Sequence, residues 1–191
     1  MKKNRIEAFS DGVIAIIITI MVLELKVPHS ATWDDLVKLA PVFGSYVLSF
    51  IYVAIYWNNH HHLFHATERV SGRILWANIH WLFWLSLMPF ASGWMGENHL
   101  TELSVAFYGF VLLATALAYV LLTHMLVTHH GVTSSLGQSI GSDQKGKVSI
   151  ALYVTGIVTA FYQPWISCLL YAVVAAIWFI PDRRIESVLP D

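Results

Sequence analysis

Charged residues are scarce in this sequence. They make up 12% of its 191 residues, against about 25% in ordinary soluble domains, whereas hydrophobic residues make up 57%. The formal net charge of -1 gives no reason to expect a nucleic-acid partner, because binding to a phosphate backbone needs an excess of positive charge. This composition excludes an ordinary soluble domain and indicates an integral membrane protein.

Features that usually point to an enzyme are also missing. Cys168 is the single cysteine, so an intrachain disulfide is excluded and cysteine spacing says nothing about a metal or redox site. The sequence contains no glycine-rich phosphate loop and no Ser/His/Asp set at a usable spacing. We therefore expect a protein without catalytic activity.

Long apolar runs, by contrast, recur along the chain. A helix needs about 20 mostly apolar residues to cross a hydrocarbon core of roughly 30 Å. Six such runs predict an all-α membrane protein that forms a single unit over residues 1–191, with spans at approximately 6–26, 40–57, 74–95, 103–127, 147–163 and 165–181. The first run is too long for a signal peptide and lacks a small-residue cleavage pattern, so we expect it to be retained as a helix.

Lysine and arginine are unevenly distributed between the two membrane sides that the six spans predict. In membrane proteins, the side with more of them is usually the cytoplasmic one. One side has only Lys26 and Lys38. The other side has Lys2, Lys3, Arg5, Arg69, Arg73, Lys145, Lys147, Arg183 and Arg184. Both termini are therefore expected in the cytoplasm, in a multi-pass protein of the cell (plasma) membrane.

The first run places Ile16, Thr19, Ile20 and Leu23 on one helix face, since successive residues are rotated by about 100°. Two interpretations stay open. In the first, the apolar residues pack against another helix and the Thr19 hydroxyl bonds to the Ala15 carbonyl. In the second, the same stripe from several subunits narrows a conduit, because rings of apolar side chains can gate a pore by dewetting.

Asp11 lies about 140° from Ile16 on the same helix, so it should face neighbouring helices when the stripe faces something else. An acid where water is scarce needs a partner. Arg5 is poorly placed for this, because it lies about 120° away on the same helix. We expect a buried polar network at this depth, with partners drawn from Asn58, His60, His61, Asn78 and His80.

The histidine run His60–His65 supports an alternative function. His61 and His65 have the four-residue spacing that places two imidazoles on one helix face, where they could bind a metal ion. His80 and His124 are candidates for axial haem ligands. The alternative is therefore a multi-helix membrane protein that binds a metal or haem. A proton-coupled transporter is less favoured, because inverted repeats and broken helices are not seen.

Arg5, Phe9, Ser10 and Asp11 open the first apolar run with the pattern Arg-x-x-x-Phe-Ser-Asp. This motif resembles the signature of the endolysosomal potassium channel family known as transmembrane protein 175, in particular its prokaryotic members. Three later stretches are also similar to that family: residues 12–25, the run from Tyr56 to His62, and Asn78 followed by Leu87-Met-Pro-Phe90. The resemblance covers the first half of the chain by motif and the whole chain by the number of predicted helices.

The resemblance implies a potassium-selective channel with six helices per chain, assembled as a homotetramer in which the first helix lines a central pore. Family members lack the Thr-Val-Gly-Tyr-Gly carbonyl filter of other potassium channels, and no such segment occurs here. The narrowest hydrophobic ring of the family falls on Ile16, a layer implicated in cation preference falls on Thr19, and a further apolar ring falls on Leu23. Ile20 belongs to the same stripe and is a further constriction candidate.

The resemblance also implies that the motif serves helix packing and assembly rather than ion contact. The expected network contains Arg5, Phe9, Ser10, Asp11, Asn78 and one of His60, His61 and His62, for which we choose His61. Glu24 is expected at the outer mouth of the pore.

A conduit, if present, must form between chains, because a single unit with so few intramembrane charges has no polar path of its own. Selectivity should be modest, since an apolar ring and hydroxyl groups offer a weaker field than stacked carbonyls. The expected partners are the lipid bilayer, other copies of the chain and monovalent cations. No cofactor and no metal site are expected, and K⁺ is the permeant ion.

Overall fold

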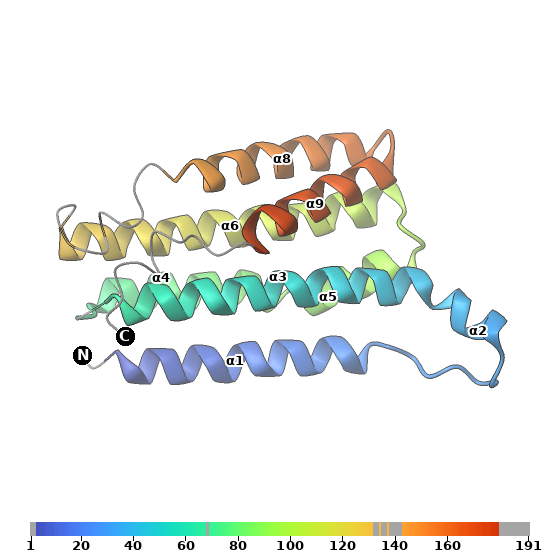
Figure 1. The fold of residues 1–191 in the computed structure, drawn as a ribbon, viewed down its shortest axis with the longest axis horizontal. Coiled ribbons are helices and arrows are strands. Elements are labelled where there is room, and N and C mark those ends of the chain that lie inside the picture. The colour runs from blue at the N-terminus through green and yellow to red at the C-terminus, as the bar shows by residue number, and fades with distance from the viewer. Residues whose placement is uncertain (1–2, 68, 132–133, 135–136, 138–142, 180–191) are drawn as a thin grey trace.

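The computed structural model describes residues 3–67, 69–131, 134, 137 and 143–179. These residues form an all-helical bundle, as the sequence predicted, and most of its helices run along the longest axis of the molecule (Figure 1). The helices are α1 (Asn4–Leu23), α2 (Trp33–Lys38), α3 (Ala40–His65), α4 (Gly72–Leu85), α5 (Met88–Glu97), α6 (Glu102–His130), α8 (Gln144–Ala160) and α9 (Pro164–Phe179).

Several helices have the length and composition of membrane spans. Among the described residues, four helical stretches meet that standard: Asn4–Leu23, Ala40–His65, Gly72–Glu97 and Glu102–His130. The helix α9 is apolar but shorter, with 16 residues, and α8 has 17 residues. The number of six spans and the side on which the termini lie therefore stay predictions.

The second predicted span does not end near residue 57, because α3 continues to His65. The polar residues after Trp57 keep their helical hydrogen bonds, and the Asn59 amide adds one by donating to the Ile55 carbonyl at 2.9 Å. Lys3 then caps the end of the helix: its Nζ donates to the carbonyls of Phe64 at 3.1 Å and His65 at 2.9 Å. A cation at these last carbonyls is favourable, so the histidine run is part of the helix.

The third predicted span is one stretch interrupted by a short link. The helix α4 ends at Leu85, and α5 begins at Met88 with a proline in its first turn. Pro89 has no backbone N–H to donate to the preceding turn, so a proline favours a new helix start here. The neighbouring boundaries also differ slightly from prediction, because α1 ends at Leu23 and α6 runs on to His130.

Tyr171 lies where α3, α6, α8 and α9 come together. Tyr171 on α9 is fully buried, and its carbonyl accepts a hydrogen bond from the Tyr52 hydroxyl at 2.6 Å. Its ring lies against Gly109 on α6 and Gly156 on α8, where an added Cβ would overlap the tyrosine ring or its hydroxyl. Glycine at these two positions therefore allows the three helices to approach closely.

The helix α1 lies at the edge of this bundle, on the opposite side from α8 (Figure 1). It packs against α3, α5 and α4. One side of α1 therefore belongs to the core of the chain, and the other side is left open.

Candidate functional site

The two sides of α1 differ in burial. Its buried residues recur every three or four positions and so share one face: Ile6, Ser10, Ile14, Ile17 and Met21. The opposite face is apolar and open, with Ile16 59% exposed, Leu23 75% exposed and Ile20 also exposed. The stripe predicted from the sequence is therefore not covered by another helix in the described part of the chain.

Thr19 lies on this open face, between the apolar side chains. Its hydroxyl donates to the Ala15 carbonyl at 2.8 Å, the hydrogen bond that the packing interpretation of this stripe included. A hydroxyl oxygen has acceptor lone pairs in addition to the proton it donates. Thr19 Oγ1 can therefore still accept a hydrogen bond or approach a cation on the open face.

The buried face of α1 carries a hydrogen-bonded chain across three helices. Asn78 on α4 donates from Nδ2 to Ser10 Oγ on α1 at 2.9 Å. Its Oδ1 is 2.9 Å from Nε2 of His60 on α3, so Nε2 of His60 must be the donor. All three side chains are at most 1% exposed. Leaving these polar groups buried without hydrogen bonds would cost free energy. The hydrogen bonds that join Ser10, Asn78 and His60 therefore fix how α1, α3 and α4 pack together.

The prediction that His61 bonds to Asn78 was wrong, since His60 is the histidine that makes this bond. His61 is exposed and its ring lies near that of Trp57, with centroids 6.3 Å apart. His60 instead stacks on Trp81 with ring centroids 4.8 Å apart. One residue along a helix turns the side chain by about 100°, which separates the buried histidine from the exposed one.

The other motif residues do not join the hydrogen bonds between Ser10, Asn78 and His60. Asp11 is exposed and accepts a hydrogen bond from Trp57 Nε1 at 3.0 Å. Trp57 was not anticipated from the sequence, which offered only amides and histidines as partners at this depth. Phe9 is 58% exposed, and Arg5 is exposed with no hydrogen bond or ion pair among the described residues. The open surface of α1 is therefore aromatic and charged near the start of the helix, where Phe9, Arg5 and Asp11 lie.

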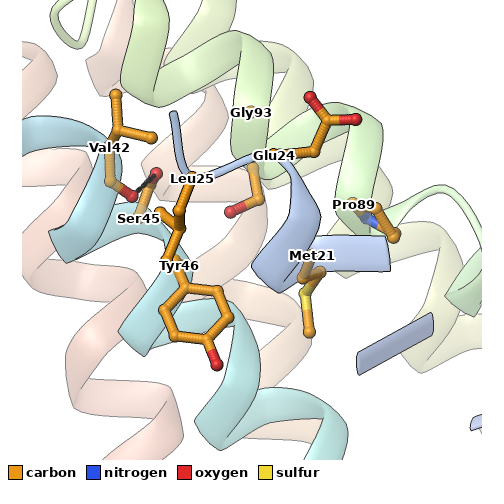
Figure 2. A pocket seen from close by; sticks show the side chains of 9 residues that line it. Met21, Glu24, Leu25, Val42, Ser45, Tyr46, Pro89 and Gly93 are labelled. Carbon is orange, nitrogen blue, oxygen red and sulfur yellow. Dashed lines mark hydrogen bonds between the residues drawn. The ribbon is translucent and has the colours of Figure 1, made fainter. Parts of the chain in front are cut away.

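At the other end of α1, Glu24 lies at the edge of a small pocket between α1, α3 and α5 (Figure 2). Ser45, Ser92 and Tyr46 give the pocket its polar lining, and the remaining lining residues are Met21, Leu25, Val42, Pro89 and Gly93. Two residues beyond, Lys26 Nζ lies 2.5 Å from Glu97 Oε1. The hydrogen bond and negative charge of Glu97 raise the pKa of the exposed Lys26. This pair ties the linker after α1 to the end of α5.

The histidines do not form a metal centre in the part of the chain that the structure describes. No group of three or more His, Cys, Asp or Glu side chains there is arranged to hold a metal ion. His80 and His124, the candidate haem ligands, are both exposed, whereas His60 is engaged with Asn78. The metal or haem alternative gains no support from this arrangement.

Comparisons with known proteins point to one family. The family model described as endosomal/lysosomal potassium channel TMEM175 matches residues 5–89. A potassium channel of Chryseobacterium sp. is 53% identical to this chain over 191 residues, which is 100% of both sequences. A potassium channel of Streptomyces collinus is 33% identical over 68% of this chain and 67% of its own length.

A solved structure agrees with these sequence matches. The crystal structure of a lysosomal potassium-selective channel TMEM175 homolog from Chamaesiphon minutus superposes with a TM-score of 0.81 and 26% identity. The match covers 94% of this chain and 97% of that one. The bundle described above is thus similar to a channel fold over nearly its whole length.

Proposed function

Because the chain belongs to the endosomal/lysosomal potassium channel family TMEM175, we propose that it is a potassium channel that conducts ions passively across a membrane. The observation that carries this function is the 53% identity, over the full length of both chains, to a protein named a potassium channel. The family is one of ion channels rather than enzymes. We therefore propose no catalytic site and no cofactor, and K⁺ as the permeant ion.

The conduit is proposed to form between chains, in a homotetramer whose four copies of α1 surround a central axis. The open face of α1 supports this arrangement, because the described residues leave its large apolar side chains exposed. Charged residues make up only 12% of the chain, and ions do not cross an apolar interior without a polar path, so we expect the path to form between chains. The assembly would bring the open faces together and leave a narrow passage between them.

Within that passage, Ile16 and Leu23 are proposed as apolar constrictions, with Ile20 between them. All three are exposed in the isolated chain, so a ring of each is available to line a pore. Thr19 lies between two of these rings, and its Oγ1 keeps acceptor capacity after donating to Ala15. We propose that Thr19 sets the preference among cations, whereas the apolar rings gate by dewetting.

Ser10, Asn78 and His60 are proposed to serve packing rather than conduction. Ser10 lies on the buried face of α1, opposite the proposed pore, and bonds to Asn78 on α4, which in turn bonds to His60 on α3. Asp11, Phe9 and Arg5 are proposed to act at assembly, because they lie on the uncovered surface near the beginning of α1. The negative charge of Glu24 would attract cations to the outer mouth. Both termini are proposed to lie in the cytoplasm, with the protein in the plasma membrane.

Ion flux from reconstituted liposomes tests the function directly. We expect K⁺ efflux that exceeds Na⁺ efflux, and a larger flux from Ile16→Asn, because a polar side chain at the constriction lowers the cost of wetting. Leu121→Asn is the matched control: Leu121 is also exposed, but on α6, and its substitution should leave flux unchanged. Absence of flux in the parent protein and in Ile16→Asn would refute the proposal.

A further inference from the structure

The short helix α2 has one apolar and one polar face. With about 100° between successive residues, Trp33, Leu36 and Val37 fall within an arc of about 100°. Asp34, Asp35 and Lys38 fall on the remaining arc. None of the residues of α2 is buried, and its apolar face is open, with Trp33 81% exposed and Val37 67% exposed. No residue that the structure describes covers this apolar face.

The polar face of α2 is satisfied locally. Thr32 caps the helix, its hydroxyl oxygen accepting the Asp35 backbone N–H at 3.3 Å. Lys38 Nζ donates to Asp35 Oδ1 at 2.6 Å, and the Ser30 hydroxyl donates to the same carboxylate. These bonds hold α2 as a separate turn of helix, so its shape does not depend on docking to the bundle.

The position of α2 indicates what surrounds it. It lies in the linker between α1 and α3, beyond the ends of the bundle (Figure 1). Both flanking helices are long and apolar enough to cross a membrane, so the linker between them emerges at a bilayer surface. Val27, in the same linker, is 83% exposed. Tryptophan is enriched at membrane–water interfaces, and amphipathic helices lie there with the apolar face turned into the lipid.

We propose that α2 is an interfacial membrane segment: Trp33, Leu36 and Val37 insert at the boundary between headgroups and acyl chains, and Asp34, Asp35 and Lys38 stay in water. A helix this short would bind lipid weakly alone, but the spans on both sides hold it at the surface and raise its effective concentration there. The inference requires that α1 and α3 cross the membrane and does not depend on ion conduction.

Site-specific fluorescence quenching tests this placement. Cys168 is the single natural cysteine, so a Cys168→Ala background accepts one new cysteine for an environment-sensitive dye. Val37→Cys and Leu36→Cys report on the apolar face, and Asp34→Cys is the matched control on the polar face of the same helix. Each labelled protein is reconstituted in phosphatidylcholine vesicles and exposed to iodide in water or to lipids that carry a shallow nitroxide.

We expect dyes at positions 36 and 37 to be quenched several-fold more by the nitroxide lipid than by iodide, and the dye at position 34 to show the reverse. Equal quenching by iodide at all three positions would overturn the inference, because α2 would then project into water. Protection of positions 36 and 37 from both quenchers would overturn it too, since a neighbouring chain would then cover the apolar face. If one apolar-face variant does not fold, the other reports on the same face.

Discussion

The helices α1 and α6 are both long, apolar and able to cross a membrane, yet they differ in how much of each is buried within the chain. In the most apolar stretch of α1, 28% of the residues are buried, against 56% in that of α6. The helix α6 packs against α4, α5, α8 and α9, whereas α1 touches α3, α4 and α5 on one side. Hydropathy alone does not reveal which apolar helix forms the core of a chain and which is left for other contacts.

The two helices also use small and polar residues differently. Gly109 on α6 admits the buried Tyr171, whereas Gly12 on α1 has no atom within 4 Å of the position of a Cβ. Thr115 on α6 and Thr19 on α1 each donate to the carbonyl four residues earlier, at 2.7 Å and 2.8 Å. Thr115 is fully buried and Thr19 is exposed. These matched pairs allow the core role of α6 and the boundary role of α1 to be tested separately.

The largest effect is expected from the glycine pair. Gly109→Ala places a methyl group onto the Tyr171 ring and hydroxyl in a close-packed region, and we expect a loss of about 3 kcal/mol of stability from overpacking. Gly12→Ala should cause no loss, because the space is open. Thermal unfolding in detergent compares the two variants. Equal losses would contradict the assignment of α6 to the core and of this side of α1 to the boundary.

A smaller loss is expected where α1 does enter the core. Asn78→Ala leaves the buried Ser10 and His60 without their shared partner, which should cost about 2 kcal/mol. Asn98→Ala is the control, because Asn98 is an exposed amide that bonds to the Trp94 carbonyl, and its loss should be near zero. The same unfolding assay measures both. A change in ion preference of Asn78→Ala with unchanged stability would contradict the packing role.

The threonine pair separates selectivity from stability. Thr19→Val keeps the shape of the side chain and removes the hydroxyl from the proposed pore, so the K⁺/Na⁺ permeability ratio should fall a few-fold while the protein stays folded. Thr115→Val makes the same change in the core, and it should leave the ratio unchanged. Flux measurements under matched ion gradients give both values. An unchanged ratio in Thr19→Val would remove Thr19 from the selectivity layer.

The smallest effect is expected at the pore mouth. Glu24→Gln should lower K⁺ conductance modestly at low salt, and the difference should vanish near 1 M salt, where the screening length is about 3 Å. Glu102→Gln, in the first turn of α6, is the control and should have no effect. Conductance measured over a salt series distinguishes them. An effect of Glu24→Gln that persists at high salt would contradict long-range attraction of ions by the Glu24 charge.

The sequence predicted the apolar helices well because each run is long, and it placed Ile16, Ile20 and Leu23 on a common face because the helical period is regular. It did not identify the correct histidine. The buried residues of α3 recur every four positions as Tyr52, Tyr56, His60 and Phe64. This period selects His60 over His61, but only if the helix continues through the polar run after Trp57.

Other features depend on contacts that no local pattern contains. The bond from Trp57 to Asp11 joins residues 46 positions apart, and the cap by Lys3 on the end of α3 spans more than 60 positions. The break between α4 and α5 was readable in principle, because Pro89 lies within the predicted span. Hydropathy does not reveal this break, because the apolar residues continue on both sides of the link between α4 and α5.

If copies of the chain meet along the open face of α1, disulfide trapping in the membrane should detect that contact. In a Cys168→Ala background, mild oxidation should link Leu23→Cys between subunits of an assembly with the native mass of four chains. Leu121→Cys, equally open but on α6, should not be linked. Linkage at position 121 without linkage at position 23, or the native mass of a single chain, would contradict the account.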